Sequence, residues 1–345
     1  MAPSLLLLAA LACSKAPEAP AEPPAAAAPA AAPKYVGLFQ PLPAVAAPAD
    51  AAAKARVDLG HALYTDARLS KNQDVSCNSC HKLDAYGVDN EPTSPGHKGQ
   101  RGGRNSPTSY NAFLHVAQFW DGRAPDVEAQ ALGPVTNPIE MAMKDDKAVD
   151  ALLRSIPGYA PMFAAAFPGE AEPVSFANAA KAIGAFERTL VTPGPFDRYL
   201  AGDVSALTAE QQAGLDTFVS TGCASCHMGA GVGGGMYQKL GLVVPYDTKD
   251  EGRKAVTKND ADLHVFKVPA LRNVEKTAPY FHDGSVATLD DAIRKMGKHQ
   301  LGKDLADSDV ASIKSFLGSL TGPLPTLTAP TLPPSGPNTP KPDPT

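Results

Sequence analysis

Residues 75–81 read VSCNSCH, and residues 221–227 read TGCASCH. The pattern Cys-x-x-Cys-His therefore occurs twice, at two distant points of the chain. It is typical of the covalent attachment of a c-type haem, in which two thiols bind the porphyrin and the adjacent histidine binds the iron. The sequence predicts two haem c groups. The attachment residues are Cys77, Cys80, Cys223 and Cys226, and the first iron ligands are His81 and His227.

Two other uses of paired cysteines fit this chain less well. A structural zinc site needs both cysteine pairs close enough to share one metal ion, and these pairs lie far apart in the sequence. A redox dithiol of the thioredoxin type needs a βαβ context, which the sequence does not show. Haem attachment is therefore the favoured interpretation.

Helices dominate the expected secondary structure. Apolar residues recur at helical spacing in several stretches, and Thr208 with Gln211 is a capping-box signature at the start of one of them. No stretch alternates apolar and polar residues as a half-buried strand does. The sequence predicts an all-α fold with long Gly- and Pro-rich loops. The expected helical segments are residues 51–64, 145–156, 176–190, 208–219, 289–296 and 307–320.

An internal repeat divides the chain. Residues 107–122 read PTSYNAFLHVAQFWDG and residues 269–284 read PALRNVEKTAPYFHDG, each downstream of a Cys-x-x-Cys-His motif. The ordered matches predict a duplicated unit, and hence two tandem cytochrome c-like domains with one covalently attached haem each. The expected bounds are 34–200 and 201–321. The matched pairs are Pro107/Pro269, Asn111/Asn273, Phe119/Phe281, Asp121/Asp283 and Gly122/Gly284.

The repeat also distinguishes the two haems by their second iron ligand. Met296 follows the second copy at a spacing like that of small monohaem cytochromes, and the corresponding position after the first copy is Pro134. A methionine ligand raises a haem's reduction potential and a second histidine lowers it. We expect Met296 to bind the second iron, the alternative being a core methionine. The first iron must use another ligand or stay open. His97 is the nearest candidate, although a lone loop histidine is more commonly solvated.

Two further residues stand near these sites. Trp120 is the only tryptophan and occupies the repeat position of His282. An aromatic residue between two redox centres can relay electrons, and it can equally be a core residue. Glu140 follows Pro134 closely, and a carboxylate near an open haem can move protons during cleavage of an O–O bond. The alternative for Glu140 is a carboxylate at the start of a helix.

The ends of the chain differ from its body. The apolar run at residues 5–12 is too short to span a membrane. Residues 10–13, ALAC, resemble a bacterial lipoprotein cleavage box, and Cys13 is the one cysteine outside the two pairs. We expect a leader (1–13), export to the periplasm and a lipid on Cys13, the alternative being an uncleaved apolar tail with an idle thiol. Residues 14–33 form a Pro/Ala linker, and residues 322–345 an unstructured tail.

Composition sets outer limits. The 345 residues are enough for about two domains. The net charge of -5, without a long basic run, argues against a nucleic-acid partner. Contact with a membrane is expected only through the lipid anchor.

Taken together, these residues resemble one family, the bacterial dihaem cytochrome c peroxidases. The resemblance covers residues 57–301. It is carried by SPTSYNAFLHVAQFWDGRA, GPVTNPIEM, VPALRNVEKTAPYFHDGSV and the two Cys-x-x-Cys-His motifs, in that family's order. By this resemblance the first haem is the low-potential, peroxidatic one, with His81 as proximal ligand and His97 as a removable distal ligand. The second is the high-potential haem that receives electrons, with His227 and Met296 as ligands.

The resemblance also assigns roles to polar residues. Gln130 and Glu140 match the polar groups of the family's peroxide pocket, with Glu140 as the acid–base residue. Trp120 matches the residue that lies between the haems. Asn105, with the carbonyl oxygens of Thr277 and Pro279, matches an interdomain calcium site, and oxygen ligands suit that ion.

The implied activity is the reduction of hydrogen peroxide to water. The resemblance implies a small donor protein, a cytochrome c or a cupredoxin, and a periplasmic homodimer. Two other functions are open. A dihaem electron carrier would not need Gln130 and Glu140 beside a displaceable ligand. A related methylamine-utilisation enzyme, which oxidises tryptophans in a partner protein, has a tyrosine on its second haem where this chain offers Met296.

Overall fold

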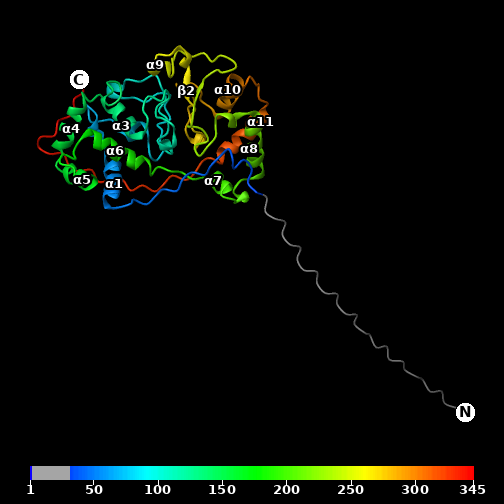
Figure 1. Cartoon of the computed structure of the whole chain (residues 1–345), viewed down its shortest axis with the longest axis horizontal. Helices are drawn as coiled ribbons and strands as arrows, with labels where there is room; N and C mark the ends of the chain where they lie inside the picture. Colours follow the sequence, from blue (N-terminus) through cyan, green and yellow to red (C-terminus); the bar gives the residue numbers. More distant parts are fainter. Residues whose placement is uncertain (2–31) are drawn as a thin grey trace. The chain divides into compact units, whose positions relative to one another are not determined.

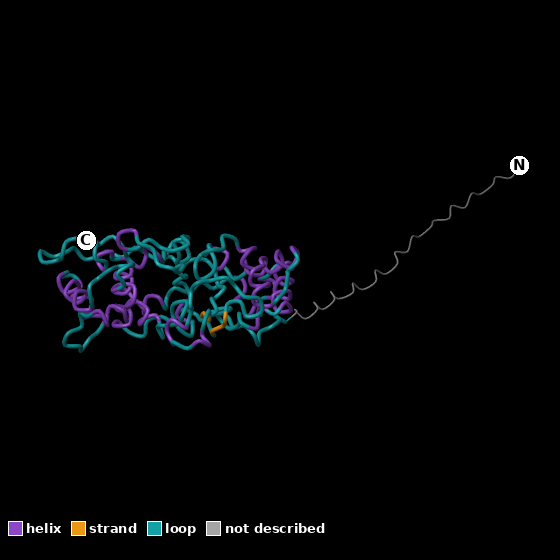
Figure 2. The backbone as a smooth tube through the Cα atoms, turned by 90° about the horizontal axis from the view of Figure 1, so that it is seen from above, coloured by secondary structure: helices purple, strands orange, loops and turns teal. Residues whose placement is uncertain are grey.

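The computed structural model describes Met1 and residues 32–345. The predicted leader, Cys13 and the linker up to residue 31 lie outside the described residues. Figures 1 and 2 show a unit built from helices joined by long loops. The described helices are α1 (Ala51–Thr65), α2 (Cys77–Cys80), α3 (Val127–Thr136), α4 (Asp146–Ser155), α5 (Tyr159–Ala166), α6 (Phe176–Glu187), α7 (Pro195–Leu200), α8 (Ala209–Thr221), α9 (Lys254–Thr257), α10 (Leu289–Leu301) and α11 (Asp307–Gly318).

The prediction of an all-α fold needs one correction. Two strands of three residues, β1 (Tyr237–Lys239) and β2 (Val265–Lys267), pair in antiparallel register, with Gln238 opposite Phe266. Strands this short carry too few residues to produce a visible alternation in the sequence. The described part of the chain is otherwise helix and loop (Figure 2).

Side-chain caps explain where several helices begin. The carboxylate of Asp50 accepts a hydrogen bond from the backbone N–H of Ala53 at the start of α1. Thr208 and Gln211 form the predicted capping box at the start of α8. These caps satisfy backbone donors that have no partner within the helix.

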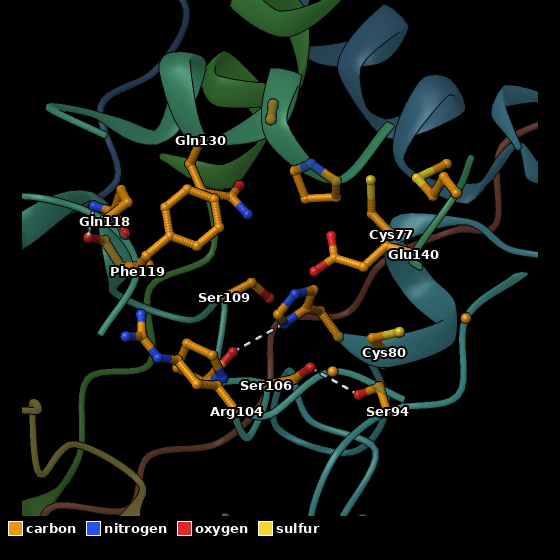
Figure 3. Close-up of a pocket in the computed structure, with 18 of the residues that line it drawn as sticks. Cys77, Cys80, Ser94, Arg104, Ser106, Ser109, Gln118, Phe119, Gln130 and Glu140 are labelled. Atoms are coloured by element: carbon orange, nitrogen blue, oxygen red, sulfur yellow. Dashed lines mark hydrogen bonds between the residues drawn. The ribbon is translucent and has the colours of Figure 1, made fainter. Parts of the chain in front are cut away.

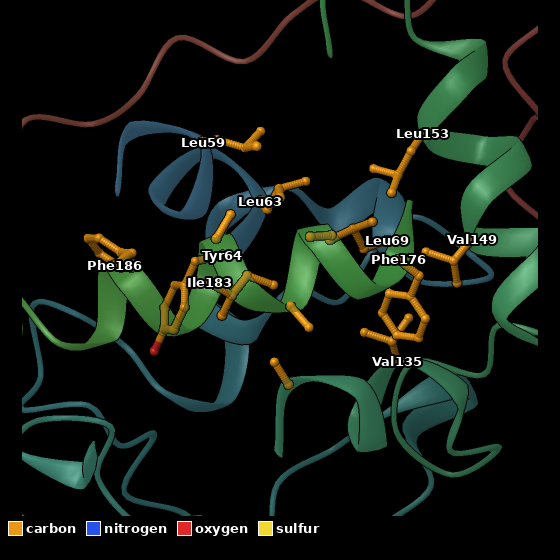
Figure 4. Packing of buried hydrophobic residues seen from close by; sticks show 14 of the residues in the cluster. Leu59, Leu63, Tyr64, Leu69, Val135, Val149, Leu153, Phe176, Ile183 and Phe186 are labelled. Carbon is orange, nitrogen blue, oxygen red and sulfur yellow. The ribbon is translucent and has the colours of Figure 1, made fainter. Parts of the chain in front are cut away.

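The first hydrophobic cluster packs α1 against α6 (Figure 4). The two helices approach closely because α1 carries Gly60, where a Cβ would overlap the carbonyl oxygen of Ala182 on α6. Helices α3, α4 and α5 cover this pair. The buried side chains labelled in Figure 4 are Leu59, Leu63, Tyr64, Leu69, Val135, Val149, Leu153, Phe176, Ile183 and Phe186.

The second hydrophobic cluster repeats this arrangement with α8 and α11. Here Gly214 of α8 takes the place of Gly60, and a Cβ at Gly214 would overlap the carbonyl oxygen of Ser312 on α11. The rings of Phe218 and Phe316 meet at a tilt across the same helix pair, with centroids 5.2 Å apart. Each cluster is therefore organised around one glycine-mediated helix crossing.

The internal repeat is confirmed in the backbone. Asn111 and Asn273 both adopt left-handed φ angles, of 61° and 60°. Both side-chain amides donate to one hydroxyl, that of Thr192, at 2.9 and 2.8 Å. Phe119 and Phe281 likewise share positive φ angles of 65° and 71°. The two copies therefore fold alike and meet at Thr192.

The ends of the described unit cross between the two clusters (Figure 1). Phe39 is buried in the second cluster, although the helix that follows it, α1, belongs to the first. Phe196 and Tyr199 also lie in the second cluster. The clusters therefore do not follow the predicted division at residue 200. In the opposite direction, Leu324 and Leu327 pack against the first cluster.

The C-terminal segment is not the unstructured tail that the sequence predicted. Residues 322–345 contain neither helix nor strand, yet they are held along the first cluster. The Thr339 hydroxyl donates to the Ser155 carbonyl at 2.9 Å, and the backbone N–H of Asp343 donates to the Lys71 carbonyl at 3.0 Å. Proline-rich segments can be ordered in this way because contacts to a folded surface replace their missing internal hydrogen bonds.

Candidate functional site

The first Cys-x-x-Cys-His motif opens onto a cavity (Figure 3). Helix α2 is a single turn that places Cys77 and Cys80 on the cavity wall, with His81 directly after it. Burial raises the pKa of the Cys77 thiol to about 12. A thiol held protonated is a poor redox nucleophile, so this environment argues against a redox dithiol.

His81 is oriented by a backbone carbonyl. Its Nδ1 lies 2.9 Å from the carbonyl oxygen of Pro107, the first residue of the repeat. Burial lowers the pKa of His81, so the ring is neutral and Nδ1 carries the proton that it donates. Nε2 then keeps its lone pair, which is the arrangement found in metal-binding histidines.

Glu140 and Gln130 point into the same cavity, from the segment after α3 and from α3 itself (Figure 3). Burial raises the pKa of the Glu140 carboxyl, an effect opposed by the charge of Arg123 and by a hydrogen bond from Asn137. Gln130 lies in the first turn of α3. This turn is fixed by the cap residue Asp126, whose carboxylate accepts a hydrogen bond from the backbone N–H of Ala129 at 2.8 Å. The cavity thus combines a proton-exchanging group with an amide donor.

Pro134 lines the first cavity, and its repeat counterpart Met296 lines the second. Proline has no atom that can bind a metal. The first cavity therefore lacks, at this position, the thioether that the second one has.

His97 is buried beside the first cavity. It does not belong to the described residues that line this cavity. Its backbone N–H donates to the Glu140 carbonyl at 2.7 Å. The preceding residue must be small, since a Cβ at Gly96 would overlap the Ile139 carbonyl oxygen. The loop of His97 is therefore packed on the segment that carries Glu140.

The second cavity brings together the other predicted haem residues. Cys223, Cys226, His227 and Met296 all line it. Burial lowers the pKa of His227 to about 4, so this ring is also neutral. Much of the remaining wall is apolar, as expected for a pocket that holds a large flat cofactor. Examples of these side chains are Phe218, Leu271, Leu289, Ile293 and Leu317.

Trp120 lines both cavities. Its indole Nε1 donates to the Asn105 carbonyl at 2.9 Å, and its ring meets that of its repeat counterpart His282 edge-on, with centroids 6.5 Å apart. Asn105, Thr277 and Pro279 gather at the second cavity. The side-chain amide of Asn105 donates to the Glu91 carbonyl at 3.0 Å.

Comparison with known proteins decides the family. The profile of a family described as di-haem cytochrome c peroxidase matches residues 54–205. Cytochrome c551 peroxidase of Pseudomonas aeruginosa is 50% identical over 291 residues, which are 83% of this chain and 84% of that protein. Cytochrome c551 peroxidase of Nitrosomonas europaea is 47% identical, covering 82% and 85%.

The chain belongs to the di-haem cytochrome c peroxidase family. Among solved structures, it resembles a MauG-like protein associated with microbial copper homeostasis, with a TM-score of 0.70 and 29% identity, over 81% of this chain and 95% of that one. The prediction of the family from the sequence is confirmed, and with it the prediction of a peroxidase-type enzyme. Membership implies two haem c groups. None of the helices in the described residues is long and apolar enough to cross a membrane.

In this family member, several residues at the cavities carried no signal in the sequence. Arg104 lines the first cavity and forms ion pairs with Asp121 at 2.6 Å and Asp250 at 2.7 Å. Glu187 on α6 also lines the first cavity, and Lys267 on β2 lines the second. These residues belong to no motif, and the partners of Arg104 and Lys267 become neighbours only through the fold.

Proposed function

We propose that this chain reduces hydrogen peroxide to water, with two electrons from a small redox protein and two protons: H2O2 + 2 e⁻ + 2 H⁺ gives 2 H2O. One observation carries the proposal. The first cavity is lined by Glu140 and Gln130, and it has Pro134 at the repeat position where the second cavity has Met296. An electron carrier has no use for an acid–base residue at an open position.

The residues of both cavities fit a covalently attached haem. Each cavity is lined by two thiols and an adjacent neutral histidine. The residues that would hold the first haem are Cys77, Cys80 and His81, and those for the second are Cys223, Cys226, His227 and Met296. When bound, the haem groups supply the iron that takes up peroxide and the electrons that reduce it.

The protein side of the reaction is proton transfer and positioning. Glu140 as a carboxylate accepts a proton from the near oxygen of peroxide and returns it to the departing oxygen, which leaves as water. Gln130 donates a hydrogen bond that orients the peroxide. Trp120 is the proposed electron relay, because it lines both cavities. Met296 would hold the second haem iron through its thioether, which would close that site to substrate and raise the haem's reduction potential.

His97 is proposed as a removable ligand that closes the first site at rest. Its loop contains Gly96, Gly99, Gly102 and Gly103, so the chain there can change conformation at low cost. His97 would leave the first site once the protein has taken up an electron, and the site would then be accessible to peroxide.

A His97→Gly variant tests the gate. It should turn over peroxide without prior reduction, whereas the native enzyme should require it. Lys98→Gly is the matched control, because Lys98 already adopts a left-handed φ of 61° that glycine accepts readily; it should keep the requirement. Stopped-flow turnover of the fully oxidised proteins gives the answer. A persistent need for pre-reduction in His97→Gly would exclude His97 as the gate.

The proposed activity itself is tested by peroxide-dependent oxidation of a reduced donor. Both a cytochrome c and a cupredoxin should be assayed, since either chemistry suits the donor. No turnover by the pre-reduced protein with calcium present would favour a dihaem carrier. Long-lived high-valent iron with poor turnover would favour oxidation of a partner protein.

Calcium, assembly and location complete the proposal. Asn105 and the carbonyl oxygens of Thr277 and Pro279 are proposed calcium ligands, supported by their shared position at the second cavity. Loss of turnover after chelation, restored by Ca²⁺ but not by Mg²⁺, would test them. We further propose a periplasmic homodimer, anchored by a lipid on Cys13; mass spectrometry of the purified N-terminus tests the lipid.

A further inference from the structure

The second cavity contains a buried cation without a counter-ion. Lys267 is the last residue of β2, and its backbone N–H donates to the Trp120 carbonyl at 2.8 Å. The residue is only 6% exposed. Among the described residues that line this cavity, Lys267 is the only lysine or arginine, and none is aspartate or glutamate. A charge removed from water in this way is costly unless an anion meets it.

The only hydrogen-bond partner of the Lys267 ammonium among the described residues is a histidine. Its Nζ lies 3.1 Å from Nδ1 of His115. Because an ammonium group can only donate, Nδ1 must be the acceptor, and the proton of the neutral ring is then on Nε2. That Nε2 is buried and has no partner in the described part of the chain. The remaining N–H groups of the Lys267 ammonium and the Nε2–H of His115 are thus left to donate to a ligand.

The position of His115 is fixed by backbone packing. The backbone N–H of Val116, the next residue, donates to the Gly234 carbonyl at 2.8 Å. Gly234 has a φ of 80°, and a Cβ there would overlap the His115 ring. The ring is therefore held against this glycine rather than free to seek solvent.

We propose that Lys267 and His115 bind a carboxylate inside the second cavity, and that this carboxylate is a propionate of the second haem. This rests on the proposed function only in placing a haem in that cavity. The ammonium supplies the charge and Nε2–H of His115 the second hydrogen bond. Since a nearby cation favours the electron-richer state of a haem, the pair raises the reduction potential of the second haem. Its position against the Trp120 carbonyl puts it on the side of the cavity that faces the first site.

The potential of each haem in the holoenzyme tests this assignment. In Lys267→Gln, the ratio of reduced to oxidised second haem at a fixed applied potential should fall about tenfold, which is 59 mV for one electron. The first haem should not shift. Lys267→Arg should retain the native potential. Lys239→Gln, the same change at an exposed position of the paired strand β1, is the matched control.

Further outcomes keep the test decisive. If Lys267→Gln does not take up haem, His115→Gln should lower the second potential and shift the propionate bending band in resonance Raman spectra. An unchanged potential and band in a fully loaded variant would overturn the proposal. A native potential that varies with chloride or acetate, lost in Lys267→Gln, would assign the site to a solute anion instead. These potentials are measured without peroxide. The outcome therefore does not depend on whether the protein shows peroxidase activity.

Discussion

Glu140 is the residue on which the proposed chemistry depends most directly. Replacement by glutamine keeps the shape and removes the acid–base function, so we expect kcat/KM for peroxide to fall by about 10²–10⁴-fold. Steady-state kinetics of Glu140→Gln measure this loss. The exposed Glu172→Gln should behave as the native enzyme. A variant within a few-fold of native activity would remove Glu140 from the mechanism.

The pH profile adds a second signature of Glu140. Burial raises its pKa above the ordinary 4.5, and the carboxylate is the form that accepts the proton. The rate should therefore rise with pH through this raised pKa, which places the acid limb of kcat/KM above 4.5. The limb should be missing from whatever activity Glu140→Gln retains.

We expect Glu187 to affect the pH dependence of the protein's stability rather than its catalysis. Burial, aided by the charge of Glu128 and opposed by Arg188, raises its pKa to about 8. Between pH 4.5 and 8 the folded protein keeps this proton and the unfolded chain does not. The free energy of unfolding should then fall as pH rises, by about 1.4 kcal/mol per pH unit from this group.

Replacing Glu187 by glutamine should flatten that dependence. The variant should melt close to the native protein at pH 5 and at a higher temperature at pH 8. Melting curves of the holoenzymes across this range decide the point, again with Glu172→Gln as control. Parallel curves for native and Glu187→Gln proteins would show that position 187 does not hold a proton in the folded state.

At the scale of elements, each hydrophobic cluster depends on one helical glycine. A Cβ at Gly60 or Gly214 would overlap a carbonyl oxygen of the facing helix, and backbone cannot move aside as a side chain can. Gly60→Ala and Gly214→Ala should each cost about 1–3 kcal/mol or more, despite the better helix propensity of alanine. Thermal melts should show the loss. Gly37→Ala, where nothing lies within 4 Å, should melt like the native protein.

The helices that the sequence predicted are those with a long amphipathic pattern. All six expected segments contain a helix, and the predicted capping box of α8 is present. Helix α3 was missed because Gly133 and Pro134 interrupt its pattern, although Asp126 does cap it. Helix α2 is a single turn and β1 and β2 have three residues each, too short for any period to show.

The residues of the candidate site likewise fall into those that the sequence predicted and those that it missed. Cys77, Cys80 and His81 are neighbours in sequence, so a motif locates them, and the repeat relates Pro134 to Met296 without a structure. Arg104 and Asp250 stand 146 positions apart, and no local pattern links them. Contacts of this kind arise only when the loops are folded together. For the same reason Gln130 was found only through the resemblance to a family, whereas Glu140 was already a candidate because it follows Pro134 closely.

At the scale of the whole molecule, the chain ends tie the two clusters together. The N-terminal segment is fixed to the second cluster by Asp197, which accepts from the Leu42 N–H at 2.7 Å and pairs with the buried Arg272 at 2.8 Å. The C-terminal segment leaves the second cluster at Leu320 and packs on the first. Each cluster therefore depends on a segment that continues from the other.

Removal of residues 329–345 tests the C-terminal crossing. It keeps Leu324 and Leu327 but deletes the contacts to Ser155 and Lys71. The backbone N–H of Lys71 donates to the Met141 carbonyl at 2.8 Å, next to Glu140. Loss of the segment should therefore loosen the first cluster and the wall of its cavity, and leave the second cluster intact.

Hydrogen–deuterium exchange resolves the two clusters separately. In the truncated holoenzyme, exchange should accelerate in residues 68–75 and 139–158 and stay unchanged in α8 and α11. Peroxide turnover should fall while the potential of the second haem stays at its native value. The single substitution Thr339→Val removes the hydroxyl that donates to the Ser155 carbonyl and should produce a smaller change of the same pattern. Uniform acceleration in both clusters, or none in either, would show that the segment does not act on the first site.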